Sequence, residues 1–143
     1  MKLTVKVIEP AYIKNVWPHV KHYIEEALEV GQQGPEELKD YGPDHVLMYL
    51  ASGQMMLIVG TSEANELKGA MTVSFLDYPK HRVAFITTFG GYLVSDKDNF
   101  VQVKSILKTY GATKLQAYCR DSMVRYVKRF GFEPRNTLVE TTV

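Results

Sequence analysis

The chain has almost no cysteine, no long apolar run and almost no net charge. Its single cysteine, Cys119, cannot form an internal disulfide, which suits a reducing compartment. No window approaches the roughly 18 apolar residues of a membrane span, so we expect no membrane partner. A net charge of +1 gives no general attraction to nucleic acid, so a nucleic-acid partner is not expected. These absences favour a cytoplasmic protein.

What is present is ordinary globular composition. The 143 residues fit one domain, which we expect to cover residues 1–143. Hydrophobic residues make up 45% and charged residues 23%, enough for a packed core with a charged surface. The first residues alternate between charged and apolar, which is typical of a strand and unlike a signal peptide.

The centre of the chain reads as a strand, a crossover helix and a second strand. The first strand is expected over Arg82 to Phe89 and is followed by Gly90-Gly91. A helix capped by Asp96 or Asp98 then runs to Tyr110, and a strand follows over Thr113 to Cys119. Because a right-handed crossover makes the two strands parallel, this unit predicts the middle of a mixed sheet.

Other segments add strands and helices before and after this unit. A long amphipathic helix is expected with Asn15 as its N-cap, Pro18 in its first turn and Gly31 as a left-handed stop. An antiparallel hairpin is expected from Gln54 to Val59 and Lys68 to Leu76.

The end of the chain completes the predicted order. One more helix is expected after Cys119, and Thr137 to Val143 is rich in β-forming residues and predicts a closing strand. We therefore predict a mixed α/β (α+β) fold with a central sheet of six to seven strands and about four helices.

Several short segments resemble one known family. The order of elements, with a last helix ending in Arg129 to Glu133 (Arg-Phe-Gly-Phe-Glu), resembles the GNAT superfamily of acetyl-CoA-dependent N-acetyltransferases. Val16 to Pro18, Tyr78-Pro79 and Phe89 to Gly91 are similar to segments of short GNAT-like proteins of bacteriophages. Some of those phage proteins are internal virion proteins and not enzymes.

The resemblance implies an acyltransferase site at the end of the fourth strand. A small-molecule or protein amine would attack the thioester of acetyl-CoA directly, and a backbone N–H near Phe89 would hold the oxyanion. The residues implied to bind the cofactor are Phe89, Gly90, Gly91 and Tyr92. The catalytic residue is unknown from the sequence; Tyr118 and Tyr126 are the candidates for handling the proton.

The sequence departs from the family pattern where the pyrophosphate of acetyl-CoA would bind. Catalytic members carry a glycine-rich loop there, whereas Tyr92 to Asn99 contains no glycine and one basic residue, Lys97. Asp96 and Asp98 would repel a phosphate, and Val127 stands where many members have a catalytic tyrosine. The alternative is therefore a non-catalytic phage virion or assembly protein, located in the host cytoplasm or the virion and contacting virion proteins.

The remaining candidate residues of the sequence have simpler interpretations than a catalytic or metal site. Cys119 has no histidine beside it in the sequence to activate it, which favours a structural thiol. His19, His22 and Glu26 share a helix face but lack further ligands, so no metal is expected. Dimerisation through the expected closing strand stays open. The last helix and its flanks carry basic residues that a solvated face explains: Arg120, Arg125, Lys128, Arg129 and Arg135.

Overall fold

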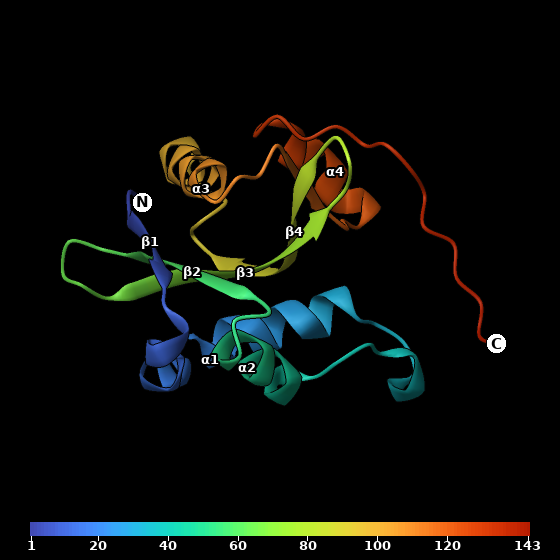
Figure 1. Cartoon of the computed structure of the whole chain (residues 1–143), viewed down its shortest axis with the longest axis horizontal. Coiled ribbons are helices and arrows are strands. Elements are labelled where there is room, and N and C mark those ends of the chain that lie inside the picture. The colour runs from blue at the N-terminus through green and yellow to red at the C-terminus, as the bar shows by residue number, and fades with distance from the viewer.

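The protein is built around a twisted five-stranded sheet with helices on both faces (Figure 1). The computed structural model describes residues 1–143. Spatial order follows chain order, and the first four strands are antiparallel while β5 runs parallel to β4. The strands are β1 (Thr4–Ile8), β2 (Met56–Thr61), β3 (Leu67–Asp77), β4 (Arg82–Gly91) and β5 (Lys114–Ala117). The mixed fold is confirmed, with five strands where six to seven were expected.

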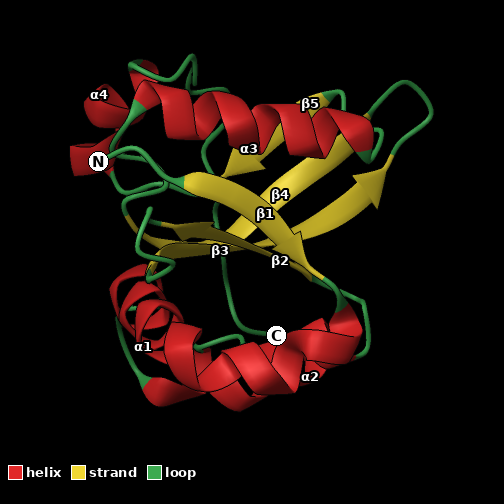
Figure 2. Ribbon diagram, turned by 90° about the vertical axis from the view of Figure 1, so that its left-hand side faces the viewer, coloured by secondary structure: helices red, strands yellow, loops and turns green.

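Four α-helices form two layers that enclose the sheet (Figure 2). One layer holds α1 (Ile13–Gly31) and α2 (Pro43–Ala51), and the other holds α3 (Lys97–Thr109) and α4 (Asp121–Lys128). Two short 3-10 turns, Pro10–Tyr12 and Glu36–Leu38, precede α1 and α2. None of these helices is both long and apolar enough to cross a membrane.

Alternation in the central strands produces two separate cores. Ile58, Met71 and Val73 point to the layer of α3, whereas Leu57 and Val59 point to the layer of α1. All five are at most 1% exposed. A sheet covered on both faces explains why β2 is almost wholly apolar.

Side-chain amides fix the start of α3 to the first strand. Asn99 is fully buried, and its Oδ1 accepts a hydrogen bond from the Leu3 N–H at 2.8 Å. Its Nδ2 donates to the carbonyl oxygens of Met1 (2.8 Å) and Tyr92 (3.2 Å). One turn later, Gln102 accepts from the Val5 N–H and donates to the Leu3 carbonyl. These bonds set the position of the α3 N-terminus relative to β1.

The expected start of the first helix was wrong, whereas the helix does end at Gly31 as expected, although not through a left-handed residue there. The α1 helix starts at Ile13, so Asn15 is not its N-cap and Pro18 lies inside the helix, past its first turn. Pro18 is exposed there, which lets water reach the Lys14 carbonyl that loses its intrahelical bond. Gly31 is not left-handed; the positive φ falls at Gly34, at +116°.

The expected closing strand is absent. Residues 132–143 contain no regular element, and every residue from Thr137 to Val143 is exposed. Leu138 and Val139 are 64% and 86% exposed. Intrinsic β-propensity does not hold a strand without a partner ladder, and the outer edge of β5 has no partner in this structure.

Candidate functional site

The fourth strand carries a bulge at Thr87. Thr88 pairs with Thr72 on β3, but the next pair joins Ile86 to Val73, so Thr87 has no Cα partner. An extra residue of this kind bends the strand and increases its twist. The bulge therefore divides β4 into a part that pairs with both β3 and β5 and a part that pairs with β3 alone.

Strands β4 and β5 separate at the same level as the bulge at Thr87. Their last pair is Ile86 with Ala117, where β5 ends, while β4 continues to Gly91. Thr87 to Gly91 consequently have a strand partner on the β3 side only. This is the place where the sequence predicted chemistry, although the parting begins before Gly90-Gly91 and not at them.

A buried threonine cluster holds the bulge. The Thr72 Oγ1 lies 2.6 Å from the hydroxyls of both Thr87 and Thr88, and the Thr87 hydroxyl donates to the Thr72 carbonyl at 3.1 Å. The Thr87 side chain also contacts Met55 and Tyr41, which belong to the layer of α1 and α2. Burial raises the pKa of the Tyr41 phenol, and its hydrogen bond with Thr87 partly offsets that effect.

Tyr41 and Thr87 were missed by sequence reasoning. Tyr41 belongs to a Tyr-Gly-Pro sequence that signals only a turn, and its partner is 46 positions away along the chain. The one signal in the sequence was the pair Thr87-Thr88 in an otherwise apolar strand. Buried hydroxyls need hydrogen-bond partners, so this pair indicates a polar contact inside the core. A phenol kept neutral beside a strand bulge is suited to donating a hydrogen bond and not to acting as a base.

The two glycines at the end of β4 have a packing role. A Cβ at Gly90 would lie 3.3 Å from the Tyr23 side chain and backbone on α1. Gly91 has a φ of +75°, and a Cβ there would overlap the Lys68 carbonyl. Both residues remain paired with β3, opposite Ala70 and Gly69. The glycines therefore let α1 and β3 approach β4 closely.

The loop between β4 and α3 is closed by its own contacts. The Tyr92 N–H donates to the Lys68 carbonyl at 2.9 Å, and the Ser95 hydroxyl donates to the Tyr92 carbonyl at 2.9 Å. Leu93 is fully buried and packs over Gly60 and Gly69. The Tyr92 N–H, one of the groups expected to contact the cofactor, is thus already occupied.

The N-terminus of α3 is occupied by a carboxylate of the same chain. Asp96 is the N-cap, and its Oδ1 accepts from the N–H groups of Asp98 at 2.8 Å and Asn99 at 3.4 Å. The sequence offered Asp96 or Asp98, and the structure places Asp96 at the cap. Asp98 adds a second negative charge in the first turn. An anion at this helix end would meet two carboxylates instead of free N–H groups.

The two tyrosines considered for proton transfer lie in different surroundings. Tyr126 is half-buried in the core beneath α3, and its hydroxyl donates to the Val94 carbonyl at 2.7 Å. Tyr118 is 68% exposed, with its ring edge-on to Phe85 at 5.0 Å. The structure does not bring them together, and Tyr126 ties α4 to the loop that precedes α3.

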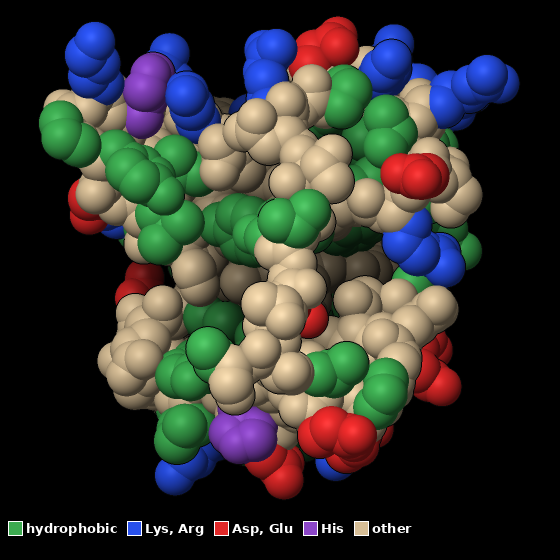
Figure 3. Space-filling model, turned by 90° about the vertical axis from the view of Figure 1, so that its right-hand side faces the viewer, with side chains coloured by type: hydrophobic (Ala, Val, Ile, Leu, Met, Phe, Trp, Pro, Cys, Tyr) green, Lys and Arg blue, Asp and Glu red, His purple; other side chains and the backbone are tan.

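Cys119 lies exposed just beyond β5. Partial desolvation by neighbouring groups raises the pKa of its thiol and the nearby Asp121 raises it further, which favours the less nucleophilic protonated form. The face of the molecule in Figure 3 is hollowed between the two helical layers, and Lys and Arg side chains gather along its upper edge. No group of three or more potential metal ligands is present.

The residues present do not fit the pyrophosphate of acetyl-CoA. Binding there requires free N–H groups at the start of α3 and a favourable charge. Asp96 takes two of those N–H groups, the Tyr92 N–H is paired, and Lys97 is the single cation of the loop. The start of α3 therefore opposes the ordinary binding mode of this cofactor.

Comparison with solved structures places the fold. An aminoglycoside acetyltransferase from an uncultured soil metagenomic sample, in complex with sisomicin, is similar with a TM-score of 0.69 and 12% identity over 99% of this chain and 96% of the other. A predicted acetyltransferase with acetyl-CoA from Clostridium acetobutylicum gives 0.64 and 12% over the same shares. Glucosamine-6-phosphate N-acetyltransferase from Arabidopsis thaliana gives 0.62 and 12% over 99% of both chains.

The resemblance lies in the fold and not in the sequence. No protein-family model matches the chain, and no curated protein matches it. Each of the three similarities covers at least 96% of this chain and of the other chain. The chain therefore has the GNAT fold, the fold of these acetyltransferases.

Proposed function

We propose that this chain is a GNAT-fold protein that does not use acetyl-CoA in the ordinary way and acts by binding other proteins. The observation that carries the proposal is the Asp96 carboxylate at the N-terminus of α3. This carboxylate accepts hydrogen bonds from two N–H groups of the first helical turn, so those groups are not free to bind a phosphate.

Electrostatics support the same conclusion. A pyrophosphate brought to this helix end would displace Asp96 from a charge-assisted bond of 2.8 Å and then lie near two carboxylates. At about 4 Å and an effective dielectric of about 20, each like-charge pair costs on the order of 4 kcal/mol before salt screening. The single nearby Lys97 offsets only part of this cost.

The expected setting is a bacteriophage particle or its assembly. The segments Val16 to Pro18 and Phe89 to Gly91, which resemble short phage GNAT-like proteins, support this setting. Partners would then be virion proteins, and the protein would be found in the host cytoplasm before packaging and in the virion afterwards.

The second candidate is an N-acyltransferase acting on a small-molecule or protein amine. The bulge at Thr87 and the unpartnered stretch of β4 beyond Ile86 favour it, because they leave strand backbone open beside β5. Similar structures are acetyltransferases by name, and one is described with acetyl-CoA. Acetyl-CoA would have to bind without the usual contacts at the α3 N-terminus.

Thermal unfolding in the presence of acetyl-CoA separates the two candidates. A ligand at a hundredfold excess over its Kd adds about 2.7 kcal/mol to stability, which is readily seen as a rise in Tm. We expect no rise at millimolar acetyl-CoA, with desulfo-CoA as a matched control. A saturable rise together with transfer to an amine would replace the first candidate with the second. Native mass analysis of purified particles tests the assembly role, and absence of the chain from them would contradict it.

A further inference from the structure

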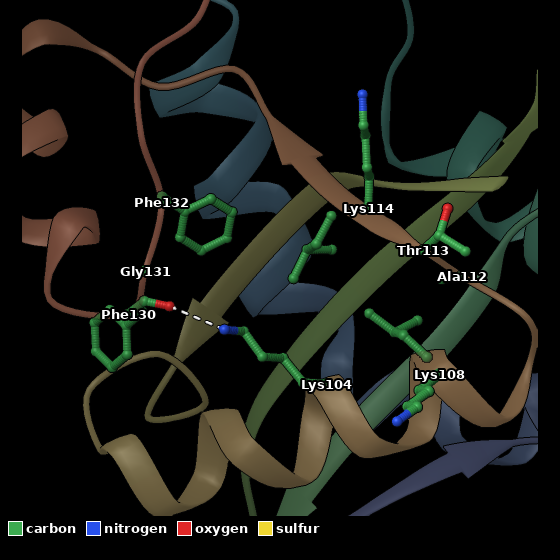
Figure 4. Close-up of a pocket in the computed structure, with 10 residues that line it drawn as sticks. Lys104, Lys108, Ala112, Thr113, Lys114, Phe130, Gly131 and Phe132 are labelled. Atoms are coloured by element: carbon green, nitrogen blue, oxygen red, sulfur yellow. Dashed lines mark hydrogen bonds between the residues drawn. The ribbon is translucent and has the colours of Figure 1, made fainter. Parts of the chain in front are cut away.

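A groove lined by apolar and basic residues lies away from the site described above. It has a volume of about 510 Å³ between the second half of α3, the start of β5 and the segment after α4 (Figure 4). Its apolar lining comprises Leu107, Ala112, Leu115, Phe130 and Phe132. Lys104, Lys108 and Lys114 stand around it, and no acidic residue lines it.

The groove is positively charged, and no carboxylate neutralises its lysines. The Lys104 Nζ donates to the Phe130 carbonyl at 3.2 Å, as the dashed line in Figure 4 marks. No carboxylate forms an ion pair with any of the three lysines. An occupant of this groove should therefore be apolar with a negative charge.

The groove runs beside an open strand edge. The sheet ends at β5, which pairs with β4 alone, so the other edge of β5 has unused N–H and C=O groups. Leu115 and Ala117 pack toward the core under α3, so a strand added at this edge would place alternate side chains over the groove.

One segment of the same sequence has the matching pattern. Thr137 to Val143 is made of β-forming residues, is entirely exposed, and carries Glu140 as its only charged side chain. Leu138 and Glu140 fall on one face of a strand because they are two residues apart. Leu138 fits the apolar floor at Leu107 and Leu115, and Glu140 fits the lysines of α3.

A molecule cannot easily use its own segment. Gly131 and Phe132 already line the groove beside the start of β5. If the chain continued along β5, the residues opposite the strand would be Glu133 to Asn136, which include Pro134 with no N–H to donate. Thr137 to Val143 would then lie past Ala117, where β5 has ended.

We propose that Thr137 to Val143 adds to the β5 edge of a second copy of this chain, with Leu138 and Glu140 in its groove. Reciprocal exchange gives a closed two-fold dimer in which each sheet gains a sixth strand. The β-forming residues of Thr137 to Val143 would then form a strand that pairs with β5 of another molecule. This inference does not depend on whether acetyl-CoA binds.

Sedimentation equilibrium of the full chain tests the exchange. From about 1 µM to about 1 mM we expect conversion from the 16.3 kDa monomer to a species of twice that mass. Leu138→Asp should weaken the dimer about tenfold or more, since burying one leucine contributes on that order. Leu38→Asp is the matched control, because Leu38 is 46% exposed and lies outside the interface. It should leave the mass unchanged.

A charge exchange identifies the contact. Lys108→Glu and Glu140→Lys should each weaken the dimer, and the double variant should regain affinity because the pair is restored with reversed sign. Both side chains are exposed in the monomer, so circular dichroism should be unchanged. A monomer at every concentration would overturn the proposal, as would a dimer indifferent to Leu138→Asp. A monomer whose residues 137–143 are protected from amide exchange would show self-docking and also overturn it.

Discussion

Replacing Asp96 with alanine probes the feature on which the functional proposal rests. The Asp96 carboxylate is the side-chain cap of α3 and accepts from the N–H groups of Asp98 and Asn99. Alanine leaves those two donors without a protein partner and removes a negative charge from the positive end of the helix dipole.

The expected loss follows from these two effects. Substitution of an N-cap by alanine typically costs about 1 kcal/mol, within a range of roughly 0.5–2 kcal/mol. The favourable charge at the helix end adds about 0.3–1 kcal/mol. We therefore expect Asp96→Ala to lower the free energy of unfolding by about 1–2 kcal/mol and the Tm by about 3–6 °C.

Urea titration followed by circular dichroism provides the assay, with two matched variants. Asp96→Asn keeps a good capping side chain and loses only the charge, so it should cost about 0.3–1 kcal/mol. Asp98→Ala removes an exposed charge from the first turn without removing a capping bond, so it should cost a similarly small amount. If Asp96→Ala is as stable as the parent, or if Asp96→Asn is equally damaging, the capping argument fails.

Two further substitutions test the contacts around the site. Asn99→Ala should lower stability by about 2–4 kcal/mol, because it leaves the buried Leu3 N–H and the Met1 carbonyl without their side-chain partner; chemical denaturation measures this, and a loss below about 1 kcal/mol would contradict the described role. Tyr126→Phe should cost about 0.5–1.5 kcal/mol through loss of the bond to the Val94 carbonyl. A stability equal to that of the parent in the same titration would show that this bond contributes nothing.

Much of the architecture could be predicted because it rests on local patterns. The near-continuous apolar run of Gln54 to Val59 follows from the burial of both sheet faces, and the alternation in Lys68 to Leu76 is typical of any strand with one apolar face; the structure has strands at Met56–Thr61 and Leu67–Asp77. Asp96 was one of two expected caps since an aspartate before a helix can bond its first N–H groups.

The remainder depends on contacts between distant residues. The bulge at Thr87 is a matter of register between β3 and β4, which no local pattern encodes. The Tyr126 hydroxyl donates to the carbonyl of Val94, which lies 32 positions earlier in the sequence. The segment Thr137 to Val143 shows the opposite failure, where a strong local preference had no neighbouring strand to pair with.

The most direct test of the central claim follows the backbone N–H groups of Asp98 and Asn99 by two-dimensional NMR during titration with acetyl-CoA. Because the Asp96 carboxylate already binds these groups, we predict that their resonances stay in place up to millimolar ligand. Saturable shifts of both resonances with a micromolar midpoint would show that pyrophosphate displaces Asp96, and would contradict the account.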